Sequence, residues 1–184
     1  MIRADLSGGA AVTSVRKLQA NEGLTWVAFV RFGEGFVVTP EEKEGLEPAV
    51  VFPLLTGRDV NQTATPKFVI DFFPHDEATA MKVAPKAFQH LVAHVKPGRD
   101  QIRDPSSRAR WWRLGRDKPE LRTALGGLRR FIATSEVSKN RVFRFVDGSV
   151  RPDHSLIVTA VDDASVLGIL SSRVHVVWAL ASGG

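Results

Sequence analysis

The sequence predicts an α/β fold of the mixed α+β type, a single compact domain in which a mixed β-sheet is flanked by helices. Runs of β-branched and aromatic residues alternate with segments of helical periodicity. The chain has 184 residues, 43% of them hydrophobic, which is enough for one core of ordinary size. No apolar run reaches the roughly 18 residues that a membrane-spanning helix needs. Because cysteines and a signal-peptide core are both lacking, we expect a cytoplasmic protein that makes no membrane contact.

Strand signals recur along the whole chain. They fall at residues 24–32, 35–39, 49–55, 67–72 and 155–161, with a further pair between residues 128 and 147. The first two runs flank Gly33-Glu34-Gly35, so we expect them to pair as a β-hairpin. Gly33-Glu34-Gly35 also resembles a glycine-rich nucleotide loop, but a strand follows it where such a loop needs a helix.

Helix signals lie between and after these strands. They fall after Thr39-Pro40, at residues 85–96, at residues 119–125, and twice in the last twenty or so residues. Thr39 and Pro40 have the residue types of an N-cap and a first helical position. Asp162-Asp163 is predicted to cap the penultimate helix, and Ser171-Ser172 to start the last one. The last helix places Val174, Val177, Trp178 and Ala181 on one face, which we expect to pack on the core.

The positive charge is concentrated in one part of the chain. Between Lys96 and Arg151 there are 15 Lys and Arg against 6 Asp and Glu, which leaves 10 against 14 elsewhere. Such an asymmetry is typical of proteins that bind a polyanion. The alternative is a solvated face whose charges only keep the protein soluble.

Arginines surround a pair of tryptophans in this basic region. Arg108, Arg110 and Arg113 flank Trp111-Trp112, and Arg103 precedes them. Guanidinium groups bind phosphate oxygens through paired hydrogen bonds, and an exposed indole can stack or give apolar support. We expect one tryptophan to be buried in the core and the other to support a phosphate-binding surface.

The strand pair between residues 128 and 147 offers candidate base-reading side chains. Strand parity places Phe143 and Phe145 toward the core with Arg141 on their face, so that Asn140, Val142 and Arg144 point the other way. Arginine can read guanine and asparagine can read adenine in the major groove. The alternative is an ordinary edge strand with a polar outer face.

Several patterns suggest hydrolytic chemistry but are incomplete. His90 and His94 have the spacing of a zinc-protease helix, yet Leu91 stands where the catalytic glutamate belongs. Glu41-Glu42-Lys43 has the form of a nuclease triplet without a convincing upstream aspartate. A phosphate-binding GxxxxGK loop and a GxSxG nucleophile elbow are both missing from the sequence. We therefore expect no catalytic or metal-binding residue in this chain, although a free-standing hydrolase remains a third hypothesis.

Five blocks, in order and at specific spacing, resemble the target-recognition domain of MmeI-like DNA methyltransferases. These are type IIG restriction-modification enzymes and related phage-defence methylases. The blocks are FVVTPEE at 36–42, PLLTGRD at 53–59, RARWW at 108–112, RFIAT at 130–134 and LGILSSRVH at 167–175. The resemblance therefore extends over nearly the whole chain.

The resemblance implies adenine-N6 methylation by a separate catalytic domain that binds S-adenosylmethionine. The Asn-Pro-Pro-Tyr motif of that domain does not occur here, so we expect no cofactor in this chain. Residues 1–184 are then a target-recognition domain, a fragment of a larger methyltransferase. Its expected partners are double-stranded DNA and the methyltransferase catalytic domain of the same parent chain.

The predicted site has two groups of residues. The resemblance assigns base selection to the segment 138–144, and parity favours Asn140 and Arg144 within it. The base-reading group is Ser138, Asn140, Arg141 and Arg144. The phosphate-binding group is Arg103, Arg108, Arg110, Arg113 and Lys139. The alternative function is a basic module that binds RNA or an acidic protein without DNA sequence specificity.

Overall fold

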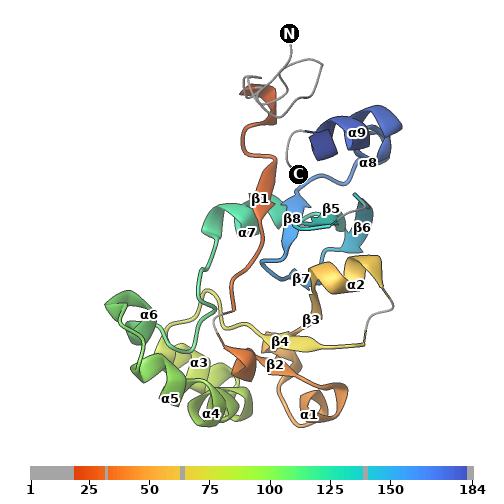
Figure 1. The fold of residues 1–184 in the computed structure, drawn as a ribbon. Coiled ribbons are helices and arrows are strands. Elements are labelled where there is room, and N and C mark those ends of the chain that lie inside the picture. Colours follow the sequence, from red (N-terminus) through yellow and green to blue (C-terminus); the bar gives the residue numbers. More distant parts are fainter. Residues whose placement is uncertain (1–18, 32, 63–64, 139–140, 182–184) are drawn as a thin grey trace.

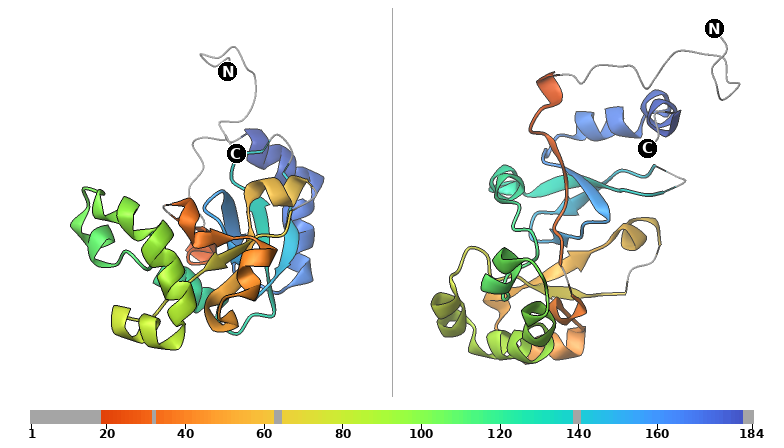
Figure 2. Two further views of the ribbon diagram at one scale, coloured as in Figure 1. Left: turned by 90° about the horizontal axis from the view of Figure 1, so that it is seen from below. Right: turned by 60° about the vertical axis from the view of Figure 1, so that its left-hand side comes forward.

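The strands of this protein form two sheets rather than one. The computed structural model describes residues 19–31, 33–62, 65–138 and 141–181. Within these residues there are two four-stranded sheets and nine α-helices, which confirms the mixed α/β class (Figure 1). The helices α3 to α6 gather beside one sheet, and α8 and α9 lie at the other end of the molecule (Figures 1 and 2).

The first sheet is antiparallel throughout and has the strand order β1-β8-β5-β6. Its strands are β1 (Thr25–Val27), β5 (Arg130–Ser135), β6 (Arg144–Asp147) and β8 (Leu156–Thr159). In the central register, Ala133 of β5 lies opposite Val158 on one side and opposite Arg144 on the other. All six residues of β5 except the first are buried, as expected for a strand in the middle of a sheet that is covered on both faces.

The second sheet has the order β2-β4-β3-β7 and is mixed, because β3 and β7 run parallel. Its strands are β2 (Val37–Val38), β3 (Val51–Leu55), β4 (Phe68–Ile70) and β7 (Arg151–Pro152). The chain enters β8 of the first sheet directly after β7, so this turn joins the two sheets. Pro53 lies within β3, yet the main-chain N–H of Leu54 still donates to Lys67 O at 2.9 Å.

The helices are short, and most begin with a recognisable cap. They are α1 (Pro40–Glu44), α2 (Gly57–Asn61), α3 (Glu77–Val83), α4 (Pro85–His94), α5 (Lys96–Asp100), α6 (Pro105–Ala109), α7 (Pro119–Leu125), α8 (Ala164–Ser171) and α9 (Arg173–Ala181). Single 3-10 turns occur at η2 (Gln19–Asn21), η3 (Glu34–Phe36) and η4 (Pro48–Val50). The predicted cap at Thr39 is confirmed, with Glu42 completing a capping box. Asp163 caps α8, and Ser172 accepts from the N–H of His175 in the first turn of α9.

The predicted hairpin around Gly33-Glu34-Gly35 is wrong. Trp26 in β1 pairs with Val158, whereas Val38 in β2 pairs with Phe68, so the two strands belong to different sheets. The segment between them crosses from one sheet to the other and ends in the 3-10 turn η3. Gly33 has a φ of 122°, which only glycine adopts easily, and it supplies a change of direction that is not a hairpin turn.

The packing predicted for the last helix is also wrong. Val174 and Val177 are 82% and 58% exposed, and Trp178 is also exposed, so this face of α9 does not join the core. No single helix in the described ranges is long and apolar enough to cross a membrane. The bent pair α8 and α9, which meet at 57°, satisfies that criterion together by length and composition only.

A buried carboxylate ties the second sheet to α7. Asp71 follows β4 and accepts two hydrogen bonds from Arg122 of α7, at 2.7 and 3.0 Å. Arg151 of β7 donates a third at 3.0 Å. The carboxylate side chain is only 1% exposed, so each arginine compensates a charge that would otherwise be costly to bury.

Candidate nucleic-acid interface

The basic segment between α5 and α7 brings the predicted phosphate-binding arginines together. Arg103 and Arg108 are exposed, and the side chain of neither has a hydrogen bond or an ion pair with any residue that the structure describes. Arg110 is half exposed, donates to Ser106 Oγ at 2.6 Å and pairs with Asp117 at 3.4 Å. Of these three, only Arg110 borders a hollow of about 400 Å³, which is large enough for a phosphate group and its water.

Arg113 is less available than the sequence suggests. Its guanidinium pairs with Asp117 at 2.8 Å and lies over the ring of Phe73, and its side chain is only 16% exposed. Below it, Arg99 is buried and donates to the main-chain oxygens of Arg31 and Arg113. Burial lowers the pKa of Arg99. Arg99 and Arg113 therefore support the hollow from inside, Arg110 lines it from the exposed side, and Arg103 and Arg108 are exposed outside it.

Both tryptophans of the basic segment are buried, which corrects the prediction that one would stay exposed. Trp111 donates its indole N–H to Glu77 at 3.1 Å, and Trp112 donates to the main-chain oxygen of His75 at 3.1 Å. Trp111 also meets the ring of Phe88 edge-on. Because each indole N–H has a partner in or just before α3, the two rings hold the arginine segment against the helical end of the molecule.

The predicted base-reading group lies at the connection between β5 and β6. Arg144 is exposed and has no polar partner among the described residues, whereas Arg141 is half-buried. Arg141 Nη1 donates to the main-chain oxygens of Ser135 at 2.8 Å and Glu136 at 3.4 Å, so this nitrogen is bound to the start of the β5–β6 connection. Ser138 is also half-buried. Lys139 and Asn140 lie outside the described residues.

The parity predicted for β6 needs correction. The buried residue of β6 is Val146, which pairs with Phe131, and Arg144 shares its face. Phe145 points to the other face, where the guanidinium of Arg130 lies 3.7 Å from its ring centre. Phe143 contacts His175 of α9. Both faces of the sheet are covered, so an aromatic residue does not by itself identify the core face.

The helix α2 lies on the same face of the first sheet as Arg144. A Cβ atom added to Gly57 would lie 2.9 Å from Ser135 Oγ, and Ser135 shares its face of β5 with Ala133, the partner of Arg144. Between α2 and the end of β5 is a hollow of about 300 Å³. Its rim includes Arg58, Asn61 and Gln62, which are all exposed. This surface was not predicted from the sequence, although Thr56 and Asp59 have the spacing of a capping box.

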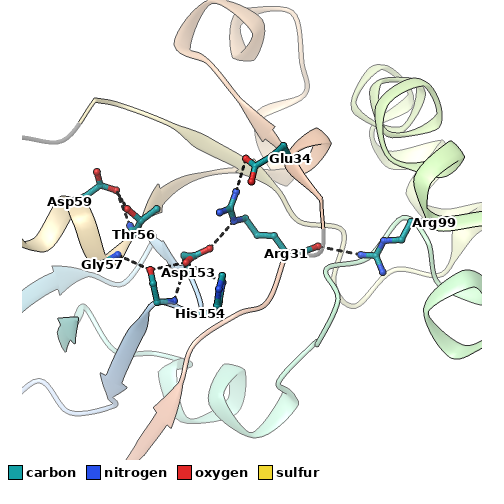
Figure 3. Close-up of polar contacts among 9 residues, drawn as sticks. Arg31, Glu34, Thr56, Gly57, Asp59, Arg99, Asp153 and His154 are labelled. Atoms are coloured by element: carbon teal, nitrogen blue, oxygen red, sulfur yellow. Dashed lines mark hydrogen bonds and ion pairs between the residues drawn. The ribbon is translucent and has the colours of Figure 1, made fainter. Parts of the chain in front are cut away.

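A chain of polar contacts fixes α2 in place (Figure 3). The N–H of Gly57 donates to Ser155 Oγ at 2.8 Å, and Ser155 Oγ donates to Asp153 at 2.8 Å. Arg31 donates to the second oxygen of Asp153 at 2.7 Å. Burial alone would raise the pKa of Asp153, but the hydrogen bonds from Ser155 and Arg31 outweigh it and hold this pKa below 3.8. The side chain is therefore a carboxylate that anchors α2, β7 and the segment after β1.

The described arginines of the two predicted groups do not share one patch. The arginines near α6 and the β5–β6 connection lie on opposite sides of the molecule in Figures 1 and 2. A domain of this length is about 40 Å across. A ligand that touches both groups must therefore be long.

His90 and His94, the two histidines with zinc-protease spacing, contact each other, and His90 also contacts a main-chain oxygen. The rings of His90 and His94 lie 4.5 Å apart, and His90 Nε2 is 3.2 Å from Gly35 O. Desolvation, together with the charge of His94, lowers the pKa of His90. Within the described ranges there is no cluster of three or more metal-ligating side chains.

Comparison with known proteins identifies a relative in fold. No family model and no curated protein matches the chain. The type IIL restriction-modification enzyme MmeI, solved in complex with DNA, shares the fold over 91% of this chain, with a TM-score of 0.63 and 13% sequence identity. The matched part covers 23% of the MmeI chain, so this chain spans about a quarter of that enzyme's length.

Proposed function

We propose that this chain is a double-stranded DNA-binding domain that gives sequence specificity to an adenine-N6 methyltransferase of a restriction-modification or phage-defence system. The observation that carries the proposal is the likeness in fold, over nearly the whole chain, to a restriction-modification enzyme solved with DNA. Methyl transfer and binding of S-adenosylmethionine belong, in this proposal, to a catalytic domain elsewhere in the same parent protein.

Two groups of side chains divide the work of binding. Arg144 reads base edges, together with the other predicted readers Ser138, Asn140 and Arg141, and exposed arginine is well suited to guanine. Arg103, Arg108 and Arg110 contact phosphates, Arg113 supports Arg110 at the hollow, and Lys139 is a further predicted phosphate contact. Specificity then comes from one side of the molecule, and much of the salt-dependent affinity comes from the other.

The distance between the groups sets the length of DNA that both can touch. The upper limit of this distance is the width of the domain, about 40 Å, which corresponds to roughly 12 base pairs at 3.4 Å per step. A shorter duplex can occupy only one group at a time. This arrangement predicts that affinity rises with duplex length up to about this size, even when the added base pairs have random sequence.

The proposal is tested by competition at matched salt. A labelled duplex of about 20 base pairs, bound to the full protein, is challenged with unlabelled duplex DNA, single-stranded RNA or an acidic polypeptide. The proposal expects duplex DNA to compete best and a selected sequence to compete better than a random one. Equal competition by all polyanions would instead support the basic interaction module.

A protein-interaction function is the second candidate, because one surface favours it. Ile169, Val174, Val177, Trp178 and Leu180 of α8 and α9 are large apolar side chains that remain exposed. Apolar patches of this kind commonly contact another protein or another domain. The two functions are compatible, since a specificity domain must also contact the rest of its enzyme.

A further inference from the structure

We infer that α2 is a second DNA-reading element, in which Arg58 and Gln62 contact base edges beside those read from the β5–β6 connection. This inference rests on the proposed DNA-binding function and adds specificity residues that neither the sequence motifs nor the comparison assigns. Three properties of α2 support it, namely its rigid attachment, the unengaged polar side chains of Arg58 and Gln62 and its position on the same face of the first sheet as Arg144.

The attachment of α2 is tight along its inner side. Gly57 and Val60 are buried, and Asp59 accepts from the N–H and the hydroxyl of Thr56 at 2.8 and 2.7 Å. The first residue of the helix is also hydrogen-bonded to Ser155, which the buried Asp153 orients. A reading element must hold its side chains in a fixed geometry, and these contacts supply that for a helix of only five residues.

The outer side of α2 has donors and acceptors without structural duties. Arg58 and Gln62 are exposed, and the side chains of both have no hydrogen bond or ion pair within the part of the chain that the structure describes. Gln62 is the C-cap that follows α2, and its main-chain N–H donates to Arg58 O at 3.0 Å, so the two residues lie one helical turn apart. Asn61 differs, since its Nδ2 donates to Gly57 O at 3.2 Å and so helps to close the helix.

The side chains of this pair suit base edges in the major groove. Arginine donates two parallel hydrogen bonds to guanine, and glutamine can donate to and accept from adenine. They border the same hollow as Glu136 and Val137, the first residues of the β5–β6 connection, and Val137 is 88% exposed. Duplex DNA that docks at this hollow would meet α2 on one side and the start of the β5–β6 connection on the other.

The test is selection of binding sites from a random duplex library by the full protein and by single variants. Arg58→Ala and Gln62→Ala should each relax the preference at one defined base pair by roughly 10- to 100-fold and leave other positions unchanged. Arg58→Lys is the decisive variant, because lysine keeps the charge but not the two parallel donors. Arg58→Lys should relax the sequence preference at the same base pair as Arg58→Ala does.

The control is Lys82→Ala, an exposed lysine of α3 at the opposite end of the molecule, which should leave the selected motif unchanged. Thermal melting of each variant checks that the fold is intact. If Arg58→Lys keeps the wild-type motif while Arg58→Ala weakens all sequences equally, Arg58 contacts phosphate only and the inference is overturned. Unchanged motif and affinity in all α2 variants overturn it as well. If the wild-type protein selects no motif, the proposed function and this inference fall together.

Discussion

The main-chain N–H of Gly57 donates a 2.8 Å hydrogen bond to the hydroxyl of Ser155, and this contact attaches α2 to the turn between β7 and β8. A side chain at Gly57 would collide with Ser135 Oγ and Ser155 O, each 2.9 Å from the added Cβ. The surface formed by α2 and the β5–β6 connection therefore depends on this glycine for its close approach.

Substitution of this glycine should destabilise the protein. Gly57→Ala is expected to lower stability by about 1–3 kcal/mol, because the backbone oxygen at Ser155 cannot move aside easily. For a protein of this size that corresponds to a fall in Tm of roughly 2–10 °C. Gly98→Ala is the matched control, since Gly98 lies in α5 with nothing within 4 Å of an added Cβ. An equal Tm for both variants would contradict the close packing of α2.

The buried ion pairs of Asp71 predict a larger effect. Asp71→Ala leaves Arg122 and Arg151 without their shared carboxylate, so we expect a loss of about 3–5 kcal/mol in the free energy of unfolding. Asp100→Ala removes an exposed partner of Lys96 and should cost at most about 1 kcal/mol. Urea denaturation measures both. A small effect at Asp71 would mean that the three charges are far better solvated than their burial indicates.

The pH dependence of stability should report on Asp153. Its pKa is lowered from 3.8 in the folded protein, so the unfolded chain takes up the proton first as the pH falls. The carboxylate therefore contributes stability above about pH 4, and this contribution is lost as the pH falls further through the lowered pKa. Asp153→Asn should reduce Tm at pH 7 and give a shallower fall between pH 5 and pH 3. A slope equal to that of the wild-type protein would exclude Asp153 as a source of acid sensitivity.

The exposed arginines in and just before α6 should control the salt dependence of DNA binding. Arg103→Ala and Arg108→Ala should each reduce the slope of log K against log salt by about 0.9 on a duplex of about 20 base pairs. Neither variant should change the selected sequence. On a duplex of about 8 base pairs centred at the reading surface, both variants should bind like the wild-type protein, because such DNA cannot span the molecule. Equal effects on short and long duplexes would contradict the two-ended arrangement.

Local signals in the sequence predicted those elements that local interactions determine. The caps at Thr39 and Asp163 were predicted correctly, and α7 has the bounds expected from Pro119 and the two glycines that follow it. Strand partners were not predictable in this way. The residues around Gly33 look like a hairpin, but the pairing of Trp26 with Val158 depends on contacts more than a hundred residues apart in the chain.

The candidate site was predicted in part for the same physical reason. The clustering of arginines near Trp111 is visible in the sequence, but the burial of both tryptophans depends on acceptors from Glu77 and His75. Strand parity located the exposed Arg144 but misassigned the core face, because both sides of β5 and part of each side of β6 are covered. Which side chains of α9 are exposed depends on what packs against it, and periodicity does not include that information.

Arg144 carries the most specific part of the proposed reading function. Arg144→Ala should change which base is preferred at one position of the bound sequence, with a loss of discrimination of about 1–3 kcal/mol. Arg110→Ala should weaken binding to all sequences by a similar factor and leave the preference intact. Sequencing of methylated sites in cells that carry the parent enzyme with each substitution measures both effects. An unaltered recognition motif for Arg144→Ala would remove this residue from the reading group.

The most direct test of the central claim is whether the protein prefers duplex DNA of a particular sequence. The measurement is a salt-matched competition in which random duplex DNA, a selected duplex and single-stranded RNA displace a labelled duplex from the full protein. The account predicts that the selected duplex competes at least 10-fold better than random duplex, and that RNA competes worst. Equal displacement by all three polyanions would contradict it.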